Sequence, residues 1–133
     1  MARLPAAALA ALLLAGVTAA DPRIDYLLQC AGCHRVDGTG LPPEVPSLVD
    51  TPGKLVAIPA GREYLVRVPG AAGSPLSDAE LAAVVNWVLR EFNAATLPED
   101  FTPLSTREVT RARRNVLADP HRFRTEHWPG LGY

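Results

Sequence analysis

The chain has 133 residues, of which 48% are hydrophobic and 20% charged, and this length allows one compact domain rather than two. Its 13 basic side chains nearly balance 14 acidic ones, which argues against a nucleic-acid-binding protein, because such a protein of this size is normally strongly basic. Aromatic residues make up only 6%, so a small core needs apolar bulk from another source, such as a cofactor, a metal or a disulfide.

Residues 1–20 are typical of a secretory signal peptide. Arg3 supplies the positive start, residues 4–17 form an apolar run rich in Ala and Leu, and Thr18-Ala19-Ala20 offers the small residues that a signal peptidase needs. The run is too short to span a bilayer comfortably, although a retained N-terminal anchor is the alternative. We therefore expect an exported protein, located in a bacterial periplasm, with no transmembrane segment after removal of the signal.

The mature chain is expected to begin with a short helix. Asp21 suits the N-cap and Pro22 the first helical position, and apolar residues recur at helical spacing over 24–31. The helix therefore runs directly into Cys30 and Cys33, the two cysteines of the chain.

Residues 30–34 read Cys-Ala-Gly-Cys-His, a C-x-x-C-H motif that in an exported protein predicts covalent attachment of haem. The thiols of Cys30 and Cys33 lie one helical turn apart and can form thioethers with two vinyl groups on one haem edge. His34 can then bind the iron as its proximal ligand. Three weaker interpretations are a thioredoxin-like redox pair, which would follow a strand, a disulfide with a very small loop, and a zinc site, which needs a fourth ligand.

Loops and helices are expected to alternate over the next sixty residues. Residues 37–53 and 69–75 contain closely spaced Pro and Gly and are predicted to be loops, while residues 54–68 are predicted to hold one or two short helical pieces. The strongest helix signal begins at Ser77, which forms a capping box with the glutamate three positions later. Its apolar residues follow a helical period up to Phe92 and predict one buried stripe.

Residues 95–133 are predicted to form an Arg-rich C-terminal extension. It begins with a Pro-containing linker over 95–104, continues as a helix over 105–118 that Asp119-Pro120 is expected to stop, and ends irregularly over 121–133. The inner face of the helix is expected to consist of Val109, Ala112, Val116 and Leu117.

Charge is distributed unevenly between the body and the extension. Residues 21–100 carry 6 basic and 11 acidic side chains, whereas residues 101–133 carry 6 arginines and 3 acidic side chains. An acidic body with a basic tail predicts either a docking element for a partner protein or a tail that wraps the body to cover the haem.

In the order of its motifs the chain resembles the class I c-type cytochromes. The matching elements are Cys-Ala-Gly-Cys-His at 30–34, Asp-Gly-Thr-Gly at 37–40, Pro-Ser-Leu at 46–48 and Leu-Ser-Asp-Ala-Glu-Leu at 76–81. The resemblance covers residues 22–93. It implies a small all-α, cytochrome c-like domain over 21–94, in which an N-terminal helix packs crosswise on a closing helix around one covalently bound haem c.

The resemblance also implies roles for residues outside the motif. Pro46 matches the proline whose backbone carbonyl accepts a hydrogen bond from the proximal histidine, and this bond would fix the orientation of His34. Trp87 matches the aromatic residue of the closing helix that packs on the first helix, and Leu48 is expected to pack on the haem. The alternative for Pro46 and Trp87 is an ordinary loop and core position.

The family's usual sixth iron ligand, a methionine from the loop before the closing helix, has no match in this sequence. Residues 69–75 contain no Met, His or Lys, and Met1 would leave with the signal. The sixth ligand would then be His121 or His127 from the extension, a residue of a partner protein, or Lys54, or the position would stay open. A second histidine would give the iron a lower reduction potential than His/Met ligation.

These features together predict a periplasmic monohaem electron carrier, or the electron-accepting subunit of a dehydrogenase, which exchanges single electrons with a redox partner such as a dehydrogenase or an oxidase. Its charge asymmetry predicts association rates that fall as salt is added. The alternative is a haem enzyme or gas-binding protein that uses an open sixth position. Arg62 and Arg67 would supply cations for such chemistry, but no distal base stands out.

Overall fold

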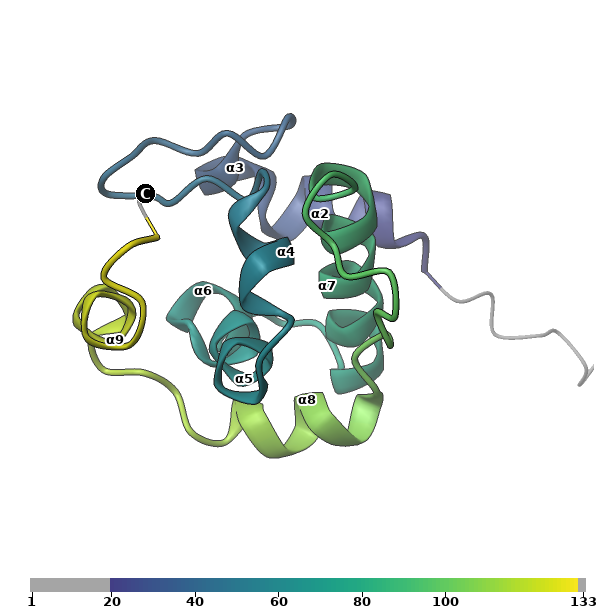
Figure 1. The fold of residues 1–133 in the computed structure, drawn as a ribbon. Helices are drawn as coiled ribbons and strands as arrows, with labels where there is room; N and C mark the ends of the chain where they lie inside the picture. The colour runs from purple at the N-terminus through teal and green to yellow at the C-terminus, as the bar shows by residue number, and fades with distance from the viewer. Residues whose placement is uncertain (1–19, 132–133) are drawn as a thin grey trace, which may run out of the picture.

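The computed structural model describes residues 20–131, which form a bundle of eight short α-helices (Figure 1). Between these limits the chain has no β-strand, only an isolated bridge that pairs Leu41 with Val45. The predicted all-α fold is therefore confirmed. The signal peptide predicted for 1–20 lies outside the described residues except for Ala20, and no helix within them is long and apolar enough to cross a membrane.

The chain starts with the expected helix, α2 (Pro22–Gln29), and continues at once into a single turn, α3 (Ala31–His34). Asp21 caps α2, because its side chain accepts a hydrogen bond from the Arg23 amide at 2.9 Å. Directly after α3 the backbone turns at Arg35, whose φ of 62° lies in the left-handed region. This turn ends the helix and sends the chain into the loop that follows.

Three short helices follow that loop: α4 (Thr51–Leu55), α5 (Pro59–Arg67) and α6 (Pro69–Ala72). The prediction that residues 37–53 and 69–75 are loops was therefore wrong for 51–53 and for 69–72. Each of these helices has a proline in its first two positions, where the missing N–H group leaves no hydrogen bond unmade. Pro52 and Pro69 therefore start helices, although they lie in segments that were predicted to be loops.

The longest helix, α7 (Asp78–Phe92), confirms the strongest prediction. The Ser77 hydroxyl accepts a hydrogen bond from the Glu80 amide at 3.3 Å, and the Glu80 carboxylate accepts one from the Ser77 amide at 2.7 Å. The apolar stripe of α7 is buried, and the helix lies against α2 (Figure 1).

The two helices of the extension differ from their prediction. Helix α8 (Thr106–Arg113) ends five residues before the predicted limit of 118, and a further helix, α9 (Pro120–His127), replaces the irregular end. The Asp119 side chain accepts a hydrogen bond from the Arg122 amide at 2.8 Å and so caps α9. The early end of α8 leaves Val116 outside the helix and 53% exposed, whereas Val109, Ala112 and Leu117 are buried as expected.

The main core lies between α2, α5, α7 and α8, and Tyr26 of α2 is at its centre. Its side chain is fully buried, and its ring centroid lies 5.1 Å from that of Trp87 and 5.5 Å from that of Phe92, both on α7. The Tyr26 hydroxyl donates a hydrogen bond to the Arg35 carbonyl at 2.6 Å. Burial raises the pKa of Tyr26 to about 12, so the hydroxyl stays protonated and remains a donor.

The extension is an integral part of the packed fold. Helix α8 packs against both α5 and α7. Where the extension begins, the Asn86 side chain of α7 binds both backbone groups of Leu104, donating to its carbonyl at 2.9 Å and accepting from its amide at 2.8 Å. Arg62 of α5 also forms an ion pair with Glu108 of α8 at 3.0 Å.

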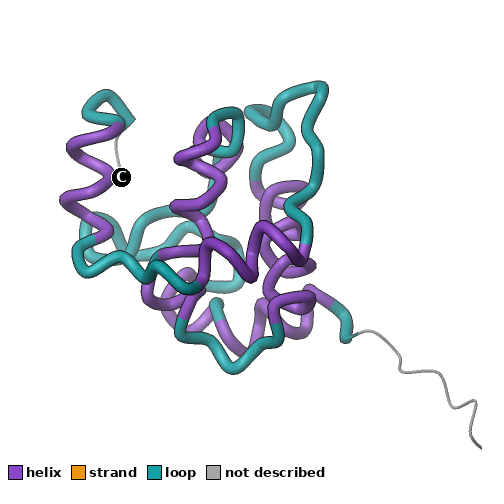
Figure 2. Tube along the Cα trace, turned by 90° about the horizontal axis from the view of Figure 1, so that it is seen from below, coloured by secondary structure: helices purple, strands orange, loops and turns teal. Residues whose placement is uncertain are grey.

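Helix α9 lies at the edge of the molecule, as both views show (Figure 1 and Figure 2), and a second hydrophobic cluster holds it there. Tyr64 of α5 stacks on Phe123 with ring centroids 5.9 Å apart and meets Trp128 edge-on at 5.4 Å. Leu55 and Leu117 complete the buried part of this cluster. The C-terminal segment is thereby fastened to α4 and α5.

We expect Tyr26→Phe to lower the free energy of unfolding by about 1–2 kcal/mol, because it keeps the ring contacts but removes the hydroxyl that satisfies the Arg35 carbonyl. Denaturant unfolding monitored by circular dichroism measures the change. Leu28→Ala on the same helix is the control, since Leu28 is 71% exposed and its loss should change the stability by no more than about 0.5 kcal/mol. Equal stabilities of the two variants would contradict this role of Tyr26.

Candidate functional site

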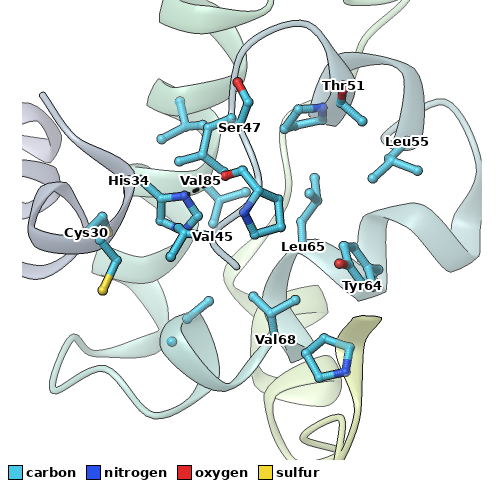
Figure 3. A pocket seen from close by; sticks show the side chains of 18 of the residues that line it. Cys30, His34, Val45, Ser47, Thr51, Leu55, Tyr64, Leu65, Val68 and Val85 are labelled. Atoms are coloured by element: carbon cyan, nitrogen blue, oxygen red, sulfur yellow. Dashed lines mark hydrogen bonds between the residues drawn. The ribbon is translucent and has the colours of Figure 1, made fainter. Parts of the chain in front are cut away.

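The structure contains a mostly apolar cavity of about 360 Å³, lined by α3, the loop at 43–48, α4, α5, α6, α7 and α9 (Figure 3). Its aliphatic lining includes Leu48, Leu65, Val68, Leu81, Val85 and Val88. Apolar side chains that face a space of this size, rather than one another, are the wall of a ligand site.

The C-x-x-C-H motif lies at the edge of this cavity, and Cys30, Cys33 and His34 all line it. Cys30 closes α2 and is half-buried, while Cys33 on α3 is exposed. Burial raises the pKa of the Cys30 thiol, and the nearby charges of Asp25 and Cys33 raise it further, so the thiol is protonated at neutral pH. The cysteines are not joined in a disulfide.

Helix α2 leads directly into the motif, whereas a thioredoxin-like redox pair was expected to follow a strand. Over residues 20–131, no three His, Cys, Asp or Glu side chains are grouped so that they could hold a metal ion. The structure thus provides the motif with an apolar cavity instead of a partner strand or a cluster of metal ligands.

His34 has a defined tautomer because of one hydrogen bond. Its Nδ1 atom lies 3.0 Å from the Pro46 carbonyl, and since a carbonyl can only accept, Nδ1 carries the hydrogen and Nε2 keeps its lone pair (Figure 3). Burial lowers the pKa of His34, and the hydrogen bond to Pro46 opposes this effect only in part. The site therefore holds a neutral, oriented imidazole with a free nitrogen lone pair.

Two glycines allow the loop to return to His34. Gly38 has a φ of 75° and Gly40 a φ of 65°, and a Cβ atom on Gly40 would lie 2.6 Å from the Val45 carbonyl oxygen. The Gly40 amide donates to the His34 carbonyl at 3.0 Å, so the loop starts beside the histidine. The end of the loop returns past His34 and so places the Pro46 carbonyl beside the imidazole.

Asn93, which the sequence analysis missed, anchors the same loop. Its side chain is fully buried and donates to the carbonyls of Leu48 and Val88 at 2.9 and 3.1 Å, while its carbonyl oxygen accepts from the Gly53 amide at 2.9 Å. The one available signal was its position directly after the last residue of the strong helix, where a polar side chain often closes a helix end.

The wall across the cavity from His34 carries no Met, His, Cys or Lys side chain. Tyr64 and Leu65 of α5 and Val68, which directly follows α5, face the motif from that side (Figure 3), and Ala71 and Ser74 continue the wall. Residues 64–74 contain no Met, His, Cys or Lys.

Helix α9 contributes polar side chains to this cavity, and its two histidines differ in whether they line it. His121 lines the cavity together with Arg124, which is only 3% exposed. His127 does not line it, because its ring stacks on Phe123 with centroids 3.8 Å apart and its Nδ1 donates to the Phe123 carbonyl at 2.8 Å. Lys54 is exposed and also lies outside the lining.

The other candidate residues lie elsewhere. Trp87 sits in the contact between α2 and α7 rather than in the cavity wall. Arg62 pairs with Glu108, and Arg67 donates to the Asn115 carbonyl at 2.7 Å, so both arginines of α5 hold the extension.

Comparison with known proteins gives a single kind of relative. No protein-family model matches the chain. Cytochrome c-552 from Thermus thermophilus is 32% identical over 107 aligned residues, which cover 67% of this chain and 82% of the relative. A second cytochrome c-552, from a strain of the same species, has the same identity and covers the same share of this chain, with 72% of the relative aligned.

We expect Asn93→Ala to lower the free energy of unfolding by roughly 2–4 kcal/mol, because two carbonyls and one amide lose a buried partner. The Gly53 amide should also exchange with deuterium faster. Denaturant unfolding and hydrogen exchange measure the two effects. Asn115→Ala is the matched control at an exposed position and should change neither quantity; an Asn93→Ala variant as stable as this control would contradict the anchoring role.

Proposed function

Because this chain belongs to the c-type cytochromes, electron carriers that hold haem c covalently and serve redox protein partners, we propose that its cavity is the haem site and that Cys30, Cys33 and His34 hold the cofactor. The observation that carries the proposal is the meeting of these three side chains at one wall of an apolar cavity. Bound there, haem supplies an iron that alternates between the ferric and ferrous states.

The residues of the cavity suit this cofactor in three ways. Cys30 and Cys33 lie one turn apart at the cavity edge, where both thiols can form thioethers with the same haem. His34 offers an imidazole lone pair whose direction is set by the Pro46 carbonyl, which is the usual arrangement for a metal-binding histidine. The aliphatic walls, Leu48 among them, exclude water and so limit the reorganisation that accompanies electron transfer.

Arg124 adds a charge that matches the cofactor. Its side chain is only 3% exposed and lines the cavity, so its positive charge lies close to a ligand bound there. Haem carries carboxylate groups, and Arg124 lines the cavity from α9. We therefore include it among the residues that orient the cofactor.

For the sixth ligand we propose His121, because it lines the cavity, whereas His127 is held by its contacts with Phe123. The alternative is an open iron in a haem enzyme or gas-binding protein. It is favoured by one specific observation, the lack of any Met, His, Cys or Lys in residues 64–74. The two proposals predict different rates for the binding of carbon monoxide to the reduced protein.

For cellular location and partner we propose export to a bacterial periplasm, supported by the composition of residues 1–20, and electron exchange with a dehydrogenase or an oxidase. The organisation proposed is a haem domain over 21–94 with an extension over 95–133 that covers part of it. Exposed arginines of the extension, among them Arg107 and Arg111, leave positive charge on its outer surface for an acidic partner.

Covalent attachment is tested by replacing each cysteine singly. In a host that attaches haem c, the wild-type polypeptide should gain the mass of one haem, and its reduced pyridine adduct should show two thioethers. Cys30→Ala and Cys33→Ala should each retain one thioether and shift the absorption band of that adduct to longer wavelength, while the double variant should lose covalent haem. A wild-type polypeptide without bound haem would refute the proposal.

The sixth ligand is tested by carbon monoxide. If His121 is the ligand, the ferrous wild type should bind carbon monoxide slowly, and His121→Ala should bind it several times faster because no ligand has to leave first. His127→Ala is the matched control and should behave like the wild type, since its ring lies outside the cavity lining. Rapid binding by the wild type, unchanged in His121→Ala, would establish the open site instead.

A further inference from the structure

Residues 72–77 run from the last residue of α6 to the N-cap of α7 and form part of the cavity wall through Ser74. Residues 73–77 have no regular secondary structure, and the backbone amides of Gly73 and Ser74 bond only locally, to the Pro69 carbonyl at 2.9 Å and to the Ala71 carbonyl at 3.2 Å. Glycines at 70 and 73 add conformational freedom to this wall. Contacts with the rest of the fold therefore hold it in place: the side chains of Ala72 and Leu76 are buried, and its more exposed middle depends on hydrogen bonds from another element.

Arg113 of α8 provides that attachment. Its Nε atom donates to the Ala72 carbonyl at 2.8 Å, its Nη1 to the Leu76 carbonyl at 2.6 Å and its Nη2 to the Ser74 carbonyl. The same Nη1 forms an ion pair with Asp78, the first residue of α7, at 3.1 Å. One planar fork of donors thus satisfies three alternate carbonyls and a carboxylate, a pattern that a single ammonium group cannot reproduce.

Helix α8 is itself fixed, so it can serve as an anchor. Its Ser105–Glu108 capping box holds its start, and Arg62 of α5 pairs with Glu108 at 3.0 Å. Thr110 donates from α8 to the Asp78 carboxylate at 2.7 Å, which adds a second link to the start of α7. The Arg113 side chain is 19% exposed and does not line the cavity, so it acts on the site only through the segment it holds.

We propose that Arg113 is a positioning residue through which the C-terminal extension holds segment 72–77 closed against the haem cavity and limits the access of water and small ligands to the iron. The inference rests on the proposed haem site. Without the fork the segment becomes a local opening unit with few remaining hydrogen bonds, and it opens more often. Water that enters stabilises the more highly charged ferric state, so opening lowers the reduction potential.

The test compares Arg113→Ala with Arg114→Ala in the full-length holoprotein that also carries His121→Ala, so that departure of a sixth ligand does not limit the carbon monoxide rate; this parent chain is the wild type of the comparison. Both variants remove one positive charge from adjacent residues, but Arg114 is exposed. Arg113→Ala should raise the association rate of carbon monoxide with the ferrous protein by roughly tenfold or more, because several charge-assisted hydrogen bonds that oppose opening are lost, and should lower the midpoint potential. Arg114→Ala should leave both values at those of the wild type.

Arg113→Lys separates the charge from the fork. It keeps the charge beside Asp78 but loses the parallel donors to the carbonyls, so its carbon monoxide rate should lie near that of Arg113→Ala. If Arg113→Ala does not accumulate as holoprotein, Arg113→Lys decides the matter. A wild-type rate and potential in whichever of these variants is measured would overturn the proposal.

Amide hydrogen exchange at Gly73 and Ser74 gives a readout that does not depend on haem. Exchange there should be faster in Arg113→Ala than in Arg114→Ala, because the segment opens more often. Equal exchange in the two variants would overturn the positioning role. A wild-type chain without covalent haem would instead overturn the proposed function, and the exchange rates would still judge the role of Arg113.

Discussion

The contact of Tyr26 with both the core and the motif is the interaction on which the rest of the structure depends. Its buried ring packs against both Trp87 and Phe92, which also contact each other, and so fixes how α2 meets α7. Its hydroxyl holds the Arg35 carbonyl, one residue after His34, at the left-handed turn that ends α3. The same side chain therefore connects the packing of the two main helices to the position of the histidine, and the loop that carries Pro46 starts from that fixed point.

The extension is better described as a wall of the site than as a free tail. Ion pairs connect it to the body in both directions. Arg113 of the extension pairs with Asp78 of the body, and Glu108 of the extension pairs with Arg62 of the body. Asn86 fastens its start, and α9 contributes Arg124 to the cavity. Of the two predictions for the basic tail, a tail that wraps the body accounts for these contacts. The exposed arginines of the extension still carry positive charge on the outer surface.

The elements that the sequence predicted well are those with local signals. The Ser77 capping box and the helical stripe after it depend on residues within one or two turns of each other, and the C-x-x-C-H motif is contained in five residues. Asn86 and Asn93 were missed because their partners lie far away in the sequence, and a lone asparagine has no periodicity that would reveal a buried role. Helix α9 was missed for another reason: Asp119-Pro120 repeats the Asp21-Pro22 signal that correctly started α2, but it was interpreted only as a stop.

The missing methionine and the Arg113 fork belong to one physical problem. A loop that supplies an iron ligand is held in place by the coordination bond, which closes it onto the cofactor. The loop before α7 has no such side chain, and it contains two glycines within four residues, so coordination cannot hold it. Hydrogen bonds from Arg113 to three of its carbonyls supply the restraint from the opposite side. An extension after the closing helix thereby takes over a mechanical task that a ligand performs elsewhere, which explains why it is packed so firmly on that part of the domain.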